Sequence, residues 1–245
     1  MPAFPVDIIP VVILSIAPGI FWLWYFYKRN TLEPEPKALV AQVFFFGMIC
    51  LAPAALIEQP FRPYPFVQTV IVAPIVEELI KFLLVYLWIA RRTDFNEPMD
   101  GIVYAAASAA ALGFASAENA LYIASAYLFP QIALDIHDPA YGLQWVWKIY
   151  LVRAFLTVPG HAVWSAMWGY AIGWARFVDP ARTRPLIVKG VLISIVLHAF
   201  FNFLVNDYPI GAAGMLFLVP LMWKMLDDRI RRAIEQSPFR KNVDE

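Results

Sequence analysis

Residues 66–90 read FVQTVIVAPIVEELIKFLLVYLWIA, an apolar stretch that contains three charged residues, Glu77, Glu78 and Lys81. A helix needs about 20 apolar residues to cross a hydrocarbon core of roughly 30 Å, so this stretch is long enough to span a bilayer. Charged side chains inside a membrane cost at least ~2.5–3.5 kcal/mol each, which makes them functional candidates. The stretch therefore predicts a transmembrane helix that carries a site.

The rest of the chain has the composition of an integral membrane protein. Of its 245 residues, 61% are hydrophobic and 16% are charged. A soluble domain is about half apolar and about a quarter charged. The net charge is zero, which argues against nucleic acid as a partner because phosphate binding requires a basic surface. The expected surroundings are the lipid bilayer.

Seven apolar segments predict an all-α polytopic bundle that forms one domain, residues 1–245. Only helices satisfy their own backbone hydrogen bonds one segment at a time in lipid, so each segment is expected to be helical. The predicted spans are 7–27, 37–57, 66–90, 99–129, 149–177, 186–205 and 210–226. We expect a break in the fifth at Pro159 and Gly160, since proline removes a backbone donor and glycine loosens the helix.

Basic residues predict the orientation of the bundle, because they gather in alternate connections. They are Lys28, Arg29 and Lys37; Arg91 and Arg92; Arg176, Arg182, Arg184 and Lys189; and Arg229, Arg231, Arg232, Arg240 and Lys241. Lys and Arg favour the cytoplasmic side of a membrane. The N-terminus is therefore expected outside the cell, with residues 228–245 forming a cytoplasmic tail.

Further polar side chains interrupt the fourth, fifth and sixth predicted spans. They are Glu118 and Asn119, Arg153 and His161, and His198 and Asn202, respectively. At about 1.5 Å of rise per residue, these groups reach depths compatible with Glu77 and Glu78, so we expect one shared cavity. Lys81 is spaced to reach either glutamate. The two carboxylates can then be held in different protonation states, as acid–base catalysis requires.

Amide hydrolysis is the chemistry that these residue types favour. It needs an activated water, a proton donor and a stabilised oxyanion. The sequence contains neither GxSxG nor HExxH and no paired catalytic aspartates, which leaves water activation by glutamate, with or without metal. His161, His198 and Glu78 would form a three-ligand zinc site with an open position. Without metal, Glu77 would take the proton of water alongside His161, with His198 and Asn202 donating to the oxyanion.

Two other functions use the same residues. A proton-coupled transporter also needs intramembrane acidic and histidine side chains, but it predicts an internal repeat, and the sequence shows none. A structural ion pair between Glu77 and Lys81 in a non-catalytic membrane scaffold is the third alternative. It explains poorly why so many costly polar groups occur in four spans.

The polar blocks resemble the PrsW family of membrane proteases, which shares a superfamily with the CAAX prenyl endopeptidases. The similar motifs are EELIK at 77–81, NEPMDG at 96–101, SAEN at 116–119, RAFLTVPGHAVWSA at 153–166 and HAFFN at 198–202, within core residues 70–205. The resemblance implies a bacterial cell-membrane protease that makes the first cut in a single-span, membrane-anchored anti-sigma factor, on the extracytoplasmic side. It places the catalytic pair at Glu77 and Glu78 and the histidines at His161 and His198. It leaves metal dependence open.

Overall fold

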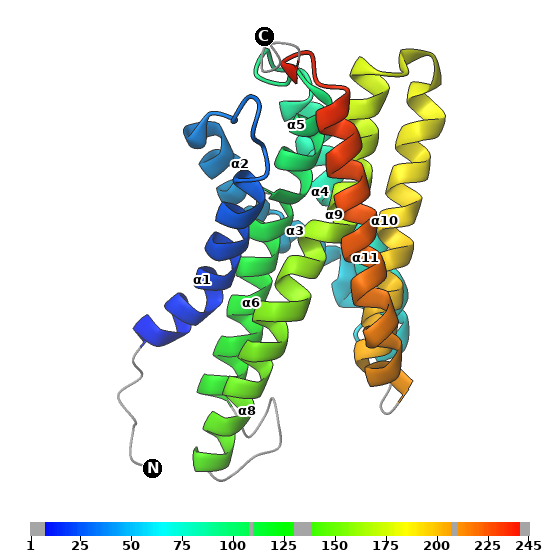
Figure 1. The fold of residues 1–245 in the computed structure, drawn as a ribbon. Coiled ribbons are helices and arrows are strands. Elements are labelled where there is room, and N and C mark those ends of the chain that lie inside the picture. Colours follow the sequence, from blue (N-terminus) through cyan, green and yellow to red (C-terminus); the bar gives the residue numbers. More distant parts are fainter. Residues whose placement is uncertain (1–7, 108–109, 130–138, 207–209, 241–245) are drawn as a thin grey trace.

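The computed structural model describes residues 8–107, 110–129, 139–206 and 210–240. These residues form helices and connecting turns, with no strand among them, which confirms the all-α prediction. The helices lie in one elongated bundle, with α1 and α2 along one side and α10 and α11 along the other (Figure 1). The C-terminal end of α11 lies close to α5 in this view.

Seven helical segments follow one another along the described chain. They are α1 (Ile8–Tyr27); α2 (Lys37–Ile49), α3 (Leu51–Glu58) and η1 (Gln59–Phe61); η2 (Val67–Val72), α4 (Ala73–Leu84) and η3 (Val85–Ile89); α5 (Pro98–Ile102), η4 (Val103–Ala107) and α6 (Ala110–Leu128); α8 (Pro139–Val152), η5 (Arg153–Thr157) and α9 (Val158–Phe177); α10 (Thr183–Asn206), after the short turn η6 (Pro180–Arg182); and α11 (Ile210–Glu235). Each overlaps one predicted span. The last extends past residue 226, so residues 228–235 of the predicted tail are helical, whereas 241–245 lie outside the described residues.

Four of these segments are long and apolar enough to cross a membrane. They are Ile9–Tyr27, Lys37–Phe61, Pro98–Leu128 and Pro180–Asn206. The segment around α4 is different because its middle carries Glu77, Glu78 and Lys81. Composition therefore marks the protein as a membrane protein, while the number of seven spans and their orientation stay predictions.

The outward faces of the helices suit a lipid environment. Large apolar side chains stand exposed along the bundle, including Leu56 at 70% and Phe217 at 79% of their surface. Contiguous apolar surface of this kind is rare on soluble monomers, and it marks a membrane or protein contact. The interior holds the large aromatic side chains, among them Trp164 and Trp168.

The predicted break at Pro159 and Gly160 is wrong, because α9 runs through both residues. Pro159 lies in the first turn of α9, where a missing N–H does not interrupt the helix. A Cβ at Gly160 would lie 2.5 Å from the ring of Trp164, so this glycine makes room for an aromatic side chain. The chain departs from α-helical geometry just before these residues, in the π-helical turn η5, which ends where α9 begins.

Helix α9 is the central element, and it packs against α5, α6, α10 and α11. Its approach to α5 is close enough to require glycine. A Cβ at Gly101 would lie 2.1 Å from the carbonyl oxygen of Gly169, and one at Gly173 would lie 2.2 Å from that of Pro98. Small residues at such crossings let helix backbones meet in membranes. This packing fixes the height of α9, and with it His161, relative to its neighbours.

Candidate active site

Helix α4 carries Glu77, Glu78 and Lys81 within about one turn, and all three are buried. Helices α9 and α10 both pack against α4, and each adds one histidine. His161 is 1% exposed and His198 is 2% exposed, with ring centroids 5.2 Å apart. The structure thus brings together five residues that the sequence predicted for one site, from three separate helices.

The Glu77 carboxylate faces both histidines without touching them. Its Oε2 atom lies 3.9 Å from Nδ1 of His161, 3.9 Å from Nε2 of His198 and 3.8 Å from Nζ of Lys81. This buried oxygen has no hydrogen-bond partner among the described residues. An unpaired buried acceptor is costly, so the space between these atoms suits a water molecule or a cation.

Each histidine uses its other nitrogen to contact a second carboxylate. Nδ1 of His198 lies 3.3 Å from Oε1 of Glu78, and Nε2 of His161 lies 3.1 Å from Oε2 of Glu118. An ionised carboxylate only accepts hydrogen bonds, so these nitrogens are the donors. The nitrogens that face Glu77 therefore carry lone pairs, and the lone pair on Nδ1 of His161 also faces the Lys81 ammonium, whose Nζ lies 3.4 Å away. Carboxylate–histidine pairs of this kind orient the histidines of metal sites.

Glu78 has the opposite environment to Glu77, because both of its oxygens accept hydrogen bonds. Oε1 is held by Lys81 and His198, and Oε2 accepts from Ser165 at 2.8 Å, Trp168 at 3.0 Å and Ser194 at 2.7 Å. No lone pair is left facing the space between the histidines. The geometry thus favours Glu77 over Glu78, the predicted metal ligand, as the third ligand beside His161 and His198.

Three partners of Glu78 were missed by the sequence reasoning. Ser165 lies four residues after His161, and Ser194 lies four residues before His198. Residues four apart share one face of a helix, and this spacing is the signal that could have found them. The third partner, Trp168, lies seven residues after His161 and thus on the same face of α9. Trp164, which was also missed, stacks on His198 with ring centroids 4.3 Å apart.

Glu118, Asn119 and Arg153 form a polar link beside His161. Arg153 donates from Nη2 to Glu118 at 2.7 Å and from Nε to Oδ1 of Asn119 at 2.8 Å. Asn119 in turn donates to the carbonyl oxygens of Leu14 and Ser15 in α1. Arg153 and Asn119 thus connect Glu118 to α1, and Glu118 contacts His161.

Asn202 does not share the contacts of the other predicted site residues. Its Nδ2 donates to the carbonyl oxygen of Thr69 at 2.9 Å. In the π-helical turn η2, that carbonyl would bond to the amide five residues on, but residue 74 is a proline without an N–H. Asn202 satisfies this carbonyl with one of its two N–H donors, a structural contact that the sequence did not predict.

A second group of carboxylates lies away from the histidines, at the start of α5. Glu33, Glu97 and Asp100 each present an oxygen within 4.8 Å of the others. Burial raises the pKa of Glu97 to about 7, and burial together with the neighbouring Asp100 raises that of Glu35 to about 10. This group consists of carboxylates without a histidine, so it differs in chemistry from the Glu77 group.

Protonation of Glu97 predicts a pH-dependent stability. Its folded-state pKa lies above the ordinary value of 4.5, so its contribution is fully present below about pH 4.5 and is lost as pH rises through about 7. The thermal unfolding midpoint in detergent should therefore fall between about pH 5 and pH 8, and less steeply in Glu97→Gln. Glu235→Gln, at an exposed carboxylate, is the control. An equal slope in wild type and Glu97→Gln would contradict this account.

The comparisons with known proteins agree with the geometry of the site. Residues 35–225 match the PrsW family intramembrane metalloprotease profile. Protease PrsW of Geobacillus kaustophilus is 30% identical over 222 residues, which cover 86% of this chain and 87% of the relative. Protease PrsW of Bacillus subtilis is 30% identical over 220 residues, covering 87% and 91%. No solved structure is significantly similar. The chain belongs to the PrsW family of intramembrane proteases.

Proposed function

We propose that this intramembrane protease hydrolyses a peptide bond of a membrane protein at the site formed by Glu77, His161 and His198. The observation that carries the proposal is the unpaired Oε2 of Glu77, which faces a lone pair on each histidine. A hydrolytic site needs such a space, in which a water molecule can meet a proton acceptor.

Glu77 is the proton acceptor that the contacts favour. Three carboxylates lie around the histidines, but Glu78 is paired with Lys81, and Glu118 is paired with Arg153 at 2.7 Å. Both are also hydrogen-bonded to a histidine. A carboxylate that already accepts several donors is a poor base, so Glu77 is the one free to take a proton from water.

As an alternative to its role as a free proton acceptor, Glu77 can serve as a metal ligand, because the donor set also fits a zinc ion. The three ligand atoms of Glu77, His161 and His198 lie within 4.8 Å of one another, and catalytic zinc sites combine three protein ligands with an open position. When bound, the ion would act as a Lewis acid and ease deprotonation of water. Glu118 and Glu78 hold the two histidine rings in place. The Lys81 ammonium, close to Glu77, adds fixed positive charge where an oxyanion would develop.

We propose a single-span membrane protein as the substrate, of the anti-sigma factor type that the family resemblance implies. Its support is the position of the site, which is buried between helices of a membrane protein. The proposed setting is a bacterial cell membrane, crossed seven times with the N-terminus outside. The transporter alternative gains no support from the relatives described above, which are named proteases.

Metal analysis combined with chelation tests the zinc assignment. Purified wild type should hold about one zinc ion per chain, and a chelator should remove both the ion and the cleavage activity until zinc is restored. His161→Ala and His198→Ala should lack the ion. The third histidine of the chain, His137, provides the matched control, and His137→Ala should keep it.

Two results would separate the alternatives. Metal-free protein that cleaves at the full rate in the presence of chelator would overturn the zinc assignment and leave the chemistry to Glu77 and His161. Zinc retained by both His161→Ala and His198→Ala would place the ion elsewhere in the protein.

A further inference from the structure

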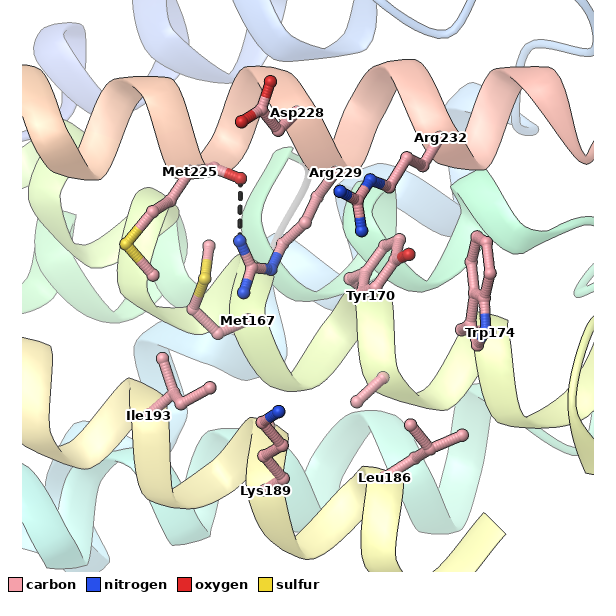
Figure 2. A pocket seen from close by; sticks show the side chains of 12 residues that line it. Met167, Tyr170, Trp174, Leu186, Lys189, Ile193, Met225, Asp228, Arg229 and Arg232 are labelled. Atoms are coloured by element: carbon pink, nitrogen blue, oxygen red, sulfur yellow. Dashed lines mark hydrogen bonds between the residues drawn. The ribbon is translucent and has the colours of Figure 1, made fainter. Parts of the chain in front are cut away.

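A cavity of about 470 Å³ lies between α9, α10 and α11, apart from the active site (Figure 2). Its wall on α9 begins at Met167 and ends at Trp174. These residues lie six and thirteen positions beyond His161, which corresponds to about 9 and 20 Å along a helix. The cavity is large enough for a small organic ligand, since such sites measure about 300–1,000 Å³.

Three cationic side chains line this cavity, Lys189 from α10 and Arg229 and Arg232 from α11 (Figure 2). In the described part of the chain, none of them lies within ion-pair distance of a carboxylate. Arg229 donates from Nη1 to the backbone carbonyl of Met225 at 2.9 Å. Asp228 also lines the cavity, but it pairs with Arg231 at 2.5 Å. The cavity lining thus holds three cationic groups and one carboxylate, which gives it a net positive charge.

The end of the cavity away from Arg232 is lined mainly by apolar side chains, with the guanidinium of Arg229 beside them (Figure 2). Met167, Ile193 and Met225 line it together in Figure 2. Each lies about ten residues from the same end of the bundle, where α9 and α11 end and α10 begins. Arg232, Trp174 and Leu186 lie nearer that end of the bundle. A wall that places cationic groups beside apolar side chains matches a ligand with an anionic head and a hydrocarbon chain.

We propose that this cavity binds an anionic phospholipid, with the phosphate among Lys189, Arg229 and Arg232 and the start of an acyl chain against Met167 and Ile193. Guanidinium groups bind phosphate through paired hydrogen bonds, and basic pockets between transmembrane helices bind anionic headgroups. Free phosphate shares the head chemistry, but it leaves the apolar end unfilled. The proposal is independent of the proposed function.

The test uses full-length protein in neutral detergent, titrated separately with phosphatidylglycerol, phosphatidylcholine and inorganic phosphate. Phosphatidylglycerol should raise the thermal unfolding midpoint, and the other two probes should not. The variant Arg229→Gln/Arg232→Gln should bind phosphatidylglycerol about thirtyfold more weakly. The control Arg184→Gln/Arg240→Gln removes the same charge from exposed residues outside the cavity and should bind like wild type.

Lys189→Gln provides a second variant on another helix, at an exposed side chain that the fold does not need. It should weaken phosphatidylglycerol binding about fivefold. Unchanged binding in Lys189→Gln and in Arg229→Gln/Arg232→Gln would overturn the proposal, and so would an equal loss in the control. An equal response to inorganic phosphate would replace the lipid site with a free-anion site.

Discussion

Glu77→Gln should lower the rate of substrate cleavage by at least about a thousandfold while leaving the fold intact. The amide cannot accept the proton of a water molecule, and no other carboxylate of the site is free of strong donors. Because Oε2 of Glu77 makes no hydrogen bond, its replacement removes none from the folded state. The measurement is cleavage of a co-reconstituted single-span membrane substrate, with the thermal unfolding midpoint recorded on the same preparation.

Glu97→Gln is the matched control for this variant. It makes the same chemical change at a carboxylate that is also buried, but in the second acidic group. Cleavage should continue in Glu97→Gln. Undiminished cleavage in Glu77→Gln would remove Glu77 from the chemistry, and equal losses in both variants would point to a general effect of altering a buried carboxylate.

Glu78→Gln should have its main effect on stability, lowering the free energy of unfolding by about 3–5 kcal/mol. The change leaves the ammonium of Lys81 buried without its closest counter-charge. It also replaces one carboxylate oxygen with an NH₂ group, which cannot accept from the donors that surround Glu78. Denaturant unfolding in detergent micelles measures the loss.

The double variant Glu78→Gln/Lys81→Met tests this explanation. If the cost is that of an unpaired buried charge, removal of Lys81 should restore most of the lost stability. Cleavage should stay impaired in the restored protein, because His198 lacks the carboxylate that orients its ring. A double variant as unstable as Glu78→Gln would show that the ion pair is not the origin of the loss.

Local chemistry is enough to predict that the protein lies in a membrane and which residues are candidates for a site. An apolar stretch long enough to span a bilayer has few alternatives to a helix, so the helical segments were predictable. Ionisable groups within such stretches are costly, so Glu77, Glu78, His161 and His198 could be selected without coordinates. The structure brings these four residues together.

The division of roles between Glu77 and Glu78 depends on tertiary structure. Adjacent residues point about 100° apart around a helix, so the two carboxylates meet different neighbours. The rotation of α4 against α9 and α10 turns Glu78 toward a ring of donors and leaves Glu77 facing two histidine lone pairs. The spacing of residues within one segment does not determine how that helix is rotated against its neighbours.

Asn202 and Pro159 are two further positions at which the sequence of a single segment does not determine the structure. Asn202 shares a helix face with His198, but one of its N–H groups donates to a carbonyl on another helix that has no amide partner. Pro159 and Gly160 predict a break in isolation, whereas a π-helical turn and the ring of Trp164 accommodate both. By itself, the sequence determined a helical membrane protein and which polar groups lie within it, because the cost of burying charge in lipid is local. Only the tertiary structure decided which contacts each group makes, because the partners of a buried polar group come from other helices.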